Sequence, residues 1–263
     1  MCRLFGLIAN KPVGVEFSFL KADTPFKSLG HKNPDGWGFG YYESGVPKIF
    51  KETVSMDKSP KPEELAKQCK SSIIISHVRQ KTKGEPKLTN THPFAYGKWL
   101  FAHNGSVSGI DYLKEKISAA YKKHIHGETD SEALFIWLIQ NIEQKGILDG
   151  LETGLKFIED NFDKATSLNF LLTDGSKLYA LRKAYIKQEY YSLYYLVRDP
   201  EHKPIYEYKS AETRQLIHSK LLNEEKAVII CSEKLTEDEN WHLIDNNTLL
   251  TIDGDLKISK IKI

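Results

Sequence analysis

Hydrophobic residues change their spacing along the chain, and these changes predict where strands and helices lie. Residues Cys2 to Ala9 are almost continuously apolar and predict a buried strand that begins at the second residue. A loop rich in structure-breaking residues follows at His31 to Gly38. Apolar and β-branched runs bounded by turn residues predict further strands at Phe39 to Tyr42, Lys48 to Lys51, Ser72 to Val78 and Lys98 to His103. The first two of these runs are predicted to pair as a hairpin.

Helical spacing replaces the strand pattern in the middle of the chain. The segment Thr129-Asp130-Ser131-Glu132 is a capping box, and the apolar residues after it recur every three to four positions, which predicts a helix. Leu148 to Asn161 predicts a second, amphipathic helix, and shorter helices are predicted at Phe17 to Lys21 and Glu63 to Lys70. Strand patterns return at Ser167 to Leu172, Lys177 to Arg182, Tyr190 to Val197, Ala227 to Cys231 and Thr248 to Ile252.

The order of strands, central helices and strands predicts an α+β fold in which helices cover mainly antiparallel sheets. The sequence has no long linker, repeat or low-complexity segment, so residues 1–263 are predicted to form a single domain. A chain of this length buries a large core without disulfide or metal crosslinks, and an enzyme is well within its size.

Charge and hydropathy exclude several classes of partner. The 37 lysines and arginines nearly balance the 35 aspartates and glutamates, which leaves a net charge of +2 and no basic surface of the kind that binds nucleic acid. No run approaches the ~20 apolar residues that a membrane span needs, and the first residues do not form a signal peptide. We therefore expect a cytoplasmic protein that binds neither nucleic acid nor membranes.

The cysteines and histidines give no sign of a metal or a cofactor. Cys2, Cys69 and Cys231 show no CxxC spacing, which favours reduced thiols over a disulfide framework or a zinc site. His124 and His126 lie close together but have no third ligand at a telling spacing. No metal and no cofactor are assigned.

If the initiator Met1 is removed, Cys2 carries both a thiol nucleophile and a free α-amino group that can act as its base. A second residue as small as cysteine normally allows this removal. A thiol titrates near pH ~8.5 and an α-amino group near ~7.7–8.0, so the amine can take the thiol proton close to neutral pH. The alternative is that a cysteine stands at this position by chance.

Five further positions carry groups that hydrolysis of an amino-acid amide needs. Asn104-Gly105 can donate a side-chain amide and a backbone N–H to an oxyanion, although Asn-Gly is also an ordinary turn. Arg79 can grip a carboxylate with Thr82 adding a hydroxyl, and Asp130 can accept from an ammonium. The alternatives are a surface ion pair for Arg79 and a helix-dipole role for Asp130.

Six motifs in order resemble those of the class II glutamine amidotransferases, and the likeness is greatest to their stand-alone, YafJ-like branch. The motifs are MCRLFG at the N-terminus, NPDGWG at residues 33–38, HVRQKT at 77–82, THPF at 91–94, FAHNG at 101–105 and TDSE at 129–132. Cys231 to Thr236 and Trp241 resemble the C-terminal pattern of that family. The family belongs to the N-terminal-nucleophile hydrolases, so the resemblance implies a four-layer αββα sandwich.

The resemblance also implies roles for individual residues. Cys2 would attack the side-chain amide and form a thioester, with its own amine as base, and water would release glutamate. Asn104 and Gly105 would form the oxyanion hole. Arg79, Thr82 and Asp130 would hold the α-carboxylate and α-ammonium of the substrate. Asp35, Gly36 and Trp37 would shape a loop near the nucleophile. The chain departs from the pattern at Lys81 and Lys83, which leaves the rim of the donor site and the preferred leaving group open.

Three functions are consistent with these residues. The leading one is a glutaminase-type amidotransferase domain that passes ammonia to an acceptor on another polypeptide, since the chain ends where bifunctional relatives would continue into a synthase domain. The second is a free-standing hydrolase of γ-glutamyl amides or peptides, whose leaving group is an organic amine. The third is a non-catalytic module that binds an amino acid. Glutamine or a γ-glutamyl compound is the expected substrate, and an acceptor subunit is a possible partner.

Overall fold

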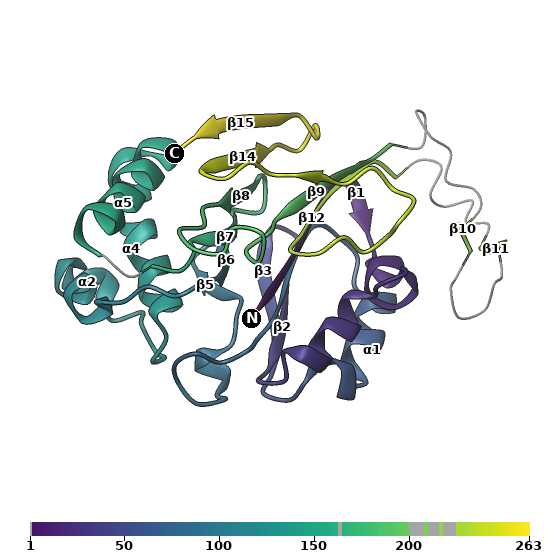
Figure 1. Ribbon diagram of the computed structural model, residues 1–263, viewed down its shortest axis with the longest axis horizontal. Helices are drawn as coiled ribbons and strands as arrows, with labels where there is room; N and C mark the ends of the chain where they lie inside the picture. The colour runs from purple at the N-terminus through teal and green to yellow at the C-terminus, as the bar shows by residue number, and fades with distance from the viewer. Residues whose placement is uncertain (1, 163–164, 200–207, 210–215, 218–224) are drawn as a thin grey trace.

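Two antiparallel sheets stacked on each other form the centre of the molecule, and helices cover their outer faces (Figure 1). The fold is that of a computed structural model, which describes residues 2–162, 165–199, 208–209, 216–217 and 225–263. Among these residues, no helix is long and apolar enough to cross a membrane. The layers run helix, sheet, sheet, helix, which is the α+β sandwich that the sequence predicts.

The first sheet contains the N-terminal strand at its centre. In the described residues its order is β13-β9-β12-β1-β4-β2-β3. The strands are β1 (Arg3–Val13), β2 (Trp37–Glu43), β3 (Val46–Glu52), β4 (Ser71–Val78), β9 (Tyr194–Arg198), β12 (Ala227–Cys231) and β13 (His242–Leu243). Strand β1 pairs with β12 on one side and β4 on the other, so both of its edges are hydrogen-bonded. The residue that precedes β1 is therefore held against the end of β4.

The second sheet has the order β15-β14-β8-β7-β6-β5. Its strands are β5 (Phe94–Tyr96), β6 (Trp99–Asn104), β7 (Asn169–Thr173), β8 (Leu178–Arg182), β14 (Thr248–Ile252) and β15 (Ile258–Lys262). Strands β10 (Tyr208–Lys209) and β11 (Leu216–Ile217) pair with each other.

Alternation along the strands decides which side chains enter the space between the sheets. Leu4 and Ile8 of β1 belong to the buried cluster between the sheets, whereas Phe5 and Leu7 belong to the cluster beneath the outer helices. Gly6 lies on the inner face, where an added Cβ would stand 3.0 Å from the Leu171 side chain of the other sheet. Each large apolar side chain buried in this layer contributes about 1.5–3 kcal/mol, which drives the two sheets together.

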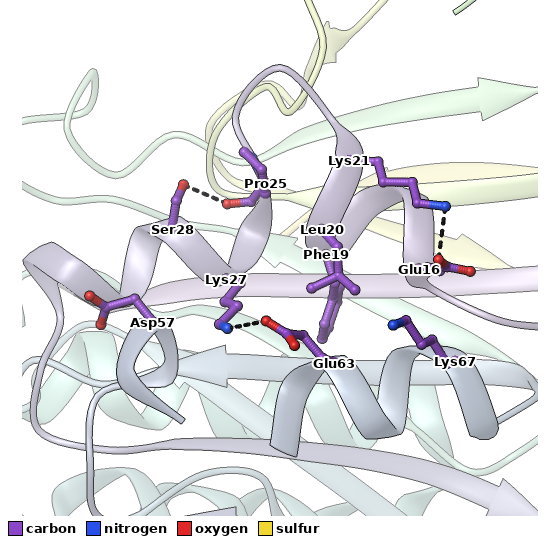
Figure 2. A pocket seen from close by; sticks show the side chains of 10 residues that line it. All are labelled: Glu16, Phe19, Leu20, Lys21, Pro25, Lys27, Ser28, Asp57, Glu63 and Lys67. Carbon is purple, nitrogen blue, oxygen red and sulfur yellow. Dashed lines mark hydrogen bonds and ion pairs between the residues drawn. The ribbon is translucent and has the colours of Figure 1, made fainter. Parts of the chain in front are cut away.

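Short helices cover the outer face of the first sheet. They are the π-helical η1 (Phe17–Lys21), the 3₁₀ helices η2 (Phe26–Lys32) and η3 (Met56–Lys58), and α1 (Lys61–Gln68). The Phe19 and Phe26 rings pack on Phe5 of β1, with ring centroids 5.1 and 5.4 Å apart. Figure 2 shows a hollow among these helices, where Lys27 pairs with Glu63 at 2.7 Å and Lys21 with Glu16 at 2.8 Å. The hollow contains none of the predicted site residues.

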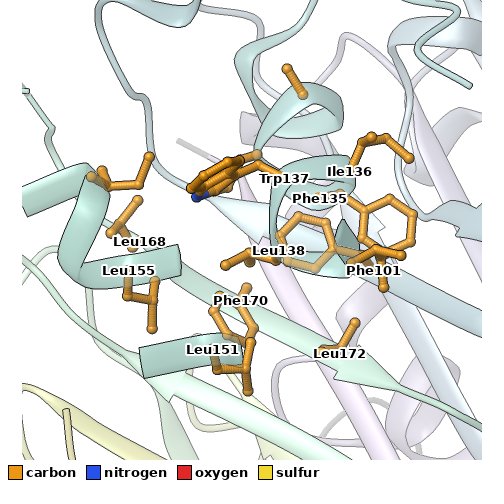
Figure 3. Close-up of a cluster of buried hydrophobic side chains, with 14 of the residues drawn as sticks. Phe101, Phe135, Ile136, Trp137, Leu138, Leu151, Leu155, Leu168, Phe170 and Leu172 are labelled. Carbon is orange, nitrogen blue, oxygen red and sulfur yellow. The ribbon is translucent and has the colours of Figure 1, made fainter. Parts of the chain in front are cut away.

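Longer helices cover the second sheet. They are α4 (Asp130–Lys145) and α5 (Ile147–Asn161), with α2 (Ile110–Lys116) and α3 (Ala119–Lys122) beside them and the 3₁₀ turn η4 (Leu88–Asn90) in the preceding loop. Figure 3 shows Trp137 and Leu138 of α4 with Leu151 and Leu155 of α5 in one cluster with Phe170 of β7. Because α4 is buried along most of its length, it holds its N-terminal residue rigidly at the edge of the sheet.

Most predicted elements are confirmed, and the differences have local causes. The hairpin of β2 and β3 and the strand β12 are as predicted. The strand predicted from Tyr190 begins only at Tyr194, because the carbonyl of Tyr191 accepts hydrogen bonds from the Asn169 and Arg182 side chains instead of joining a ladder. The loop predicted from His31 begins later, because His31 and Lys32 close η2.

Candidate active site

Cys2 lies at the end of the two central strands of the first sheet. Arg3 at the start of β1 pairs with Val78 at the end of β4, so Cys2 lies beside the residues that leave β4. Its Sγ accepts a hydrogen bond from the Gln80 N–H at 3.3 Å and is 3.4 Å from the Gln80 carbonyl. Cys2 is half-buried in this position, so its thiol is held in one orientation although it lies near the end of the chain.

Burial raises the pKa of the Cys2 thiol above its ordinary value. The Gln80 N–H and the Arg79 guanidinium act in the opposite direction, because each stabilises a thiolate, but burial is the larger effect. The thiol is therefore protonated at neutral pH and needs a base to become a nucleophile. The predicted removal of Met1 concerns a residue outside the described part of the chain.

Arg79 is buried directly beside Cys2. Its Nη2 donates to the Lys83 and Gly84 carbonyls at 2.9 and 3.0 Å, and Nη1 donates to Glu85 and Asp35 carbonyls at 3.3 and 3.4 Å. No carboxylate of a described residue forms an ion pair with it, so the alternative of a surface ion pair is wrong. Burial lowers the pKa of the Arg79 guanidinium, and the Cys2 thiol and the Asp35 and Glu85 carboxylates act in the opposite direction without forming an ion pair with it.

The predicted near-site loop braces the same segment. Asp35 accepts from the Lys81 N–H at 2.8 Å, and the Arg79 N–H donates to the Gly36 carbonyl at 2.8 Å. Gly36 has φ +122°, and an added Cβ would lie 2.8 Å from the Glu52 carbonyl, so only glycine fits this turn. Trp37 is buried and donates to Glu52 at 3.0 Å. These contacts keep the strand end beside Cys2 in place.

Asn104 and Gly105 end β6 on the facing sheet. Asn104 is buried, and its Oδ1 accepts no hydrogen bond from the described residues. An added Cβ at Gly105 would stand 1.8 Å from the Ser167 carbonyl, so the two backbones approach as only glycine allows. The pair does not close a hairpin, because β6 pairs with β5 before it and with β7 far along the chain. Asn104-Gly105 is therefore not the turn of a hairpin, although the chain bends at Gly105.

Cys2 and Asn104 belong to the same end and the same layer of the sandwich. Because side chains alternate along a strand, Cys2 points to the same side of its sheet as Leu4, and Asn104 points to the same side of its sheet as Ala102. Leu4 and Ala102 both lie in the cluster between the sheets. Tyr191 connects the two sides. Burial raises the pKa of Tyr191, and the nearby Tyr190 and Cys2 add smaller contributions. The Tyr191 carbonyl accepts from Asn169, the residue opposite Asn104 in β7.

Asp130 and Thr82 have different surroundings. Asp130 begins α4, where Thr129 Oγ1 caps the helix by accepting from the Glu132 N–H at 3.3 Å. Its Oδ2 accepts from the Val107 N–H at 2.6 Å, which ties the helix to the loop after Gly105. Asp130 thus supports the Asn104 side of the site. Thr82 is exposed on the loop after β4 and makes no hydrogen bond with the described residues, so the structure does not bring it to the others.

Three buried histidines of the site are absent from the sequence predictions. His103 bonds through its two ring nitrogens to Ser131 Oγ at 2.9 Å and the Ser167 carbonyl at 3.1 Å. The His77 ring contacts the His92 ring at an interplanar angle of 39°, with ring centroids 4.1 Å apart, and burial lowers the pKa of His77 to about 3, so its ring is neutral. Each of the three stands within one of the six motifs, which was the available signal.

No group of three or more histidine, cysteine, aspartate or glutamate side chains in the described part of the chain could hold a metal ion. The residues described above place a thiol beside a buried cation on one sheet, and an amide and a glycine backbone at the end of a strand of the other sheet. Such a set can form and stabilise a thioester.

Substituting Gly105 tests whether the close backbone approach is essential for the fold. Gly105→Ala is expected to lower stability by about 4 kcal/mol or more, since the Ser167 carbonyl must move to make room. Gly254→Ala is the matched control, because its nearest neighbour would be 4.0 Å away. Thermal unfolding of both variants measures the difference, and equal melting temperatures would contradict the packing described.

Comparison with known proteins identifies the family. The model of the class II glutamine amidotransferases matches residues 1–261. The chain is 33% identical over 190 residues to the putative glutamine amidotransferase YafJ of Escherichia coli, covering 66% of this chain and 70% of the relative. It is 34% identical over 79 residues, 30% of this chain and 34% of the relative, to a γ-glutamyl-hercynylcysteine sulfoxide hydrolase of Mycobacterium tuberculosis.

The fold also matches a solved structure. Glutamine phosphoribosylpyrophosphate amidotransferase from B. subtilis superposes with a TM-score of 0.66 at 15% identity, over 99% of this chain and 49% of that one. At this identity the likeness concerns the fold, and it agrees with the four layers seen here. With a family match over nearly its whole length, a four-layer sandwich and a cysteine beside a buried arginine at the end of β1, the chain belongs to the class II glutamine amidotransferases.

Proposed function

We propose that the protein hydrolyses the side-chain amide of a γ-glutamyl donor, by default glutamine, through a thioester on Cys2. The observation that carries the proposal is the position of Cys2 Sγ on the Gln80 N–H, beside the buried Arg79 and at the same end of the sandwich as Asn104. Residues 1–263 act in it as one amidotransferase domain.

The reaction begins once Met1 has been removed. The free α-amine of Cys2 takes the thiol proton, and Sγ forms a bond to the amide carbon. Asn104 Nδ2 and the Gly105 N–H stabilise the oxyanion. The amine then passes its proton to the nitrogen, the C–N bond breaks, and ammonia or an amine leaves. Water attacks the thioester, glutamate departs, and the thiol is restored.

The amino-acid end of the donor is held by charge. The α-carboxylate pairs with Arg79. Four backbone carbonyls hold the guanidinium of Arg79 in place. Asp130 retains one carboxylate oxygen beyond the one bound to Val107, and it accepts from the α-ammonium. Thr82 lies on the exposed loop and adds its hydroxyl when that loop meets the substrate.

Two fates of the nitrogen follow from the same chemistry. In the leading proposal, ammonia passes to an acceptor on another polypeptide. A free-standing γ-glutamyl amide hydrolase is the second candidate, favoured by a pocket of about 470 Å³ that Arg3 and Gln80, the neighbours of Cys2, help to line. The name of the mycobacterial relative points to the same reaction class.

Glutamate release tests the proposal and separates the two candidates. Intact-mass measurement first establishes that Met1 is absent, and glutamate release is then measured from glutamine and from γ-glutamyl peptides, with and without cell extract. Stimulation of glutamine turnover by extract supports an acceptor chain, whereas extract-independent turnover of peptides supports the hydrolase. Processed protein that releases glutamate from neither would overturn the proposal and favour a non-catalytic module.

The activity is expected to rise with pH. Because burial raises the pKa of the Cys2 thiol, and because the α-amine accepts a proton only when neutral, kcat/KM should increase from about pH 6 to about pH 8.5. Initial rates across this range measure the profile, with circular dichroism at each pH to show that the fold persists. A kcat/KM that falls between about pH 6 and 8 would contradict this assignment of nucleophile and base.

A further inference from the structure

A pocket of about 470 Å³ beside Cys2 has no role in the steps above. We call it the leaving-group pocket and define it by Arg3, Lys32, Asn33, Gln80, Tyr190 and Glu233 among its lining residues. Two of these touch Cys2 directly. The Gln80 N–H donates to its Sγ at 3.3 Å, and Arg3 Nη1 donates to its carbonyl at 3.1 Å. The amine that is expelled as the Cys2 thioester forms can therefore enter the pocket.

The volume of the pocket suits an organic molecule rather than ammonia. A water molecule, which is close to ammonia in size, occupies about 30 Å³ in the liquid, whereas sites for small organic ligands measure about 300–1,000 Å³. The observed volume lies within the second range. An amino acid or a short peptide would fill much more of it than ammonia would.

Asn33 provides a buried acceptor in the wall of the pocket. Its side chain is only 3% exposed, and its Nδ2 donates to the Leu29 carbonyl at 2.6 Å, which fixes the amide at the end of η2. Its Oδ1 accepts no hydrogen bond from the described residues. A buried acceptor without a donor costs about 1–3 kcal/mol, so an N–H of a bound ligand would recover that energy.

The charges around the pocket favour an anionic group. Glu233 forms an ion pair with Arg3, whose guanidinium also lies 5.7 Å from the centroid of the Tyr190 ring. His31, also in the wall, lies 3.7 Å from the Asp57 carboxylate. Lys32 is exposed and forms no ion pair with any residue that the structure describes. The one carboxylate among the lining residues, that of Glu233, is thus paired with Arg3, whereas the Lys32 ammonium can pair with a ligand.

We propose that this pocket binds the amine leaving group of the reaction, and that this group is an amino acid or short peptide with a free carboxylate. The carboxylate pairs with Lys32, and an N–H bonds to Asn33 Oδ1. The inference rests on the proposed Cys2 hydrolysis: the γ-amide C–N bond breaks, the departing nitrogen takes the proton from the Cys2 amine, and the amino acid is released while the glutamyl group stays on sulfur. The pocket therefore favours the second candidate, the free-standing hydrolase, with γ-glutamyl peptides as its substrate class.

A matched pair of substrates tests the pairing with Lys32. γ-Glutamyl-alanine and γ-glutamyl-alaninamide differ only in the terminal carboxylate. The wild-type protein is expected to favour the first by about fivefold to tenfold in kcat/KM, as a charge-assisted contact at a partly exposed site allows. Lys32→Gln should bring the ratio of the two kcat/KM values close to one. Lys122→Gln, an exposed lysine on α3, is the control and should keep the wild-type ratio.

The outcomes separate the pocket from the chemistry. Hydrolysis of both peptides at equal rates by the wild-type protein, or a ratio that survives Lys32→Gln, would overturn the pocket assignment and leave the proposed function standing. If processed protein hydrolyses neither these peptides nor glutamine, the proposed function fails. Calorimetric binding of the two peptides to the Cys2→Ala protein then decides the pocket, since tighter binding of γ-glutamyl-alanine supports it and equal binding overturns it.

Discussion

Replacement of Cys2 with alanine is expected to lower glutamate release by a factor on the order of 10⁴ or more, because no other described thiol can serve as nucleophile at this site. Cys69 and Cys231 are buried, and burial raises their pKa values to about 11 and about 12. Glutamate binding should persist in the Cys2→Ala protein, since Arg79 and Asp130 are unchanged. Release of glutamate by a coupled assay, and its binding by calorimetry, measure the two effects.

Cys69→Ala is the matched control for this substitution. Cys69 lies in the cluster beneath the outer helices and outside the site, so its variant should keep hydrolytic activity at the cost of a modest loss of stability. Retained activity in Cys2→Ala, or loss of activity in Cys69→Ala while the fold persists, would show that the nucleophile has been assigned to the wrong residue.

Asn104→Ala is expected to reduce kcat by about 10²–10³-fold with little change in KM, because an oxyanion donor acts mainly in the transition state. The side chain is buried and its Oδ1 has no donor among the described residues, so the substitution removes few existing contacts. Steady-state kinetics with the preferred γ-glutamyl substrate measure both parameters.

Asn161→Ala serves as the control for Asn104. Asn161 ends α5 in an exposed position, where its Nδ2 donates to the Phe157 carbonyl at 2.9 Å. Its variant should retain both kinetic parameters. A raised KM with unchanged kcat in Asn104→Ala would mean that Asn104 binds the ground state, and the oxyanion role would then be withdrawn.

The candidate site could be predicted in its residue types but only partly in its contacts. Cys2, Arg79 and Asn104-Gly105 stand at strand ends that local hydrophobic patterns mark, and the structure brings these strand ends to one end of the sandwich. The sequence predicts Asp130 as an ammonium acceptor, and the structure adds its bond to the Val107 N–H. The sequence predicts Thr82 beside Arg79, whereas in the structure Thr82 lies exposed on the loop.

The partners of Arg79 show why the remaining contacts were beyond sequence reasoning. Its guanidinium is held by backbone carbonyls, and every residue type offers a carbonyl, so no side-chain pattern signals such a site. The ring contact between His77 and His92 likewise depends on how a strand and a loop meet in space.

The sequence by itself determined the local features of this protein: the strand period at Ala227–Cys231, the cap at Thr129 and the glycine at Gly105. Each depends on neighbouring residues or on a backbone conformation that one residue type permits. Only the tertiary structure decided that Cys2 faces the layer of Asn104 and that a pocket with Asn33 and Lys32 opens beside it. These features depend on the register between strands and on the packing of η2 against the sheet. Both are fixed only when segments that are distant in the sequence come together to bury the core.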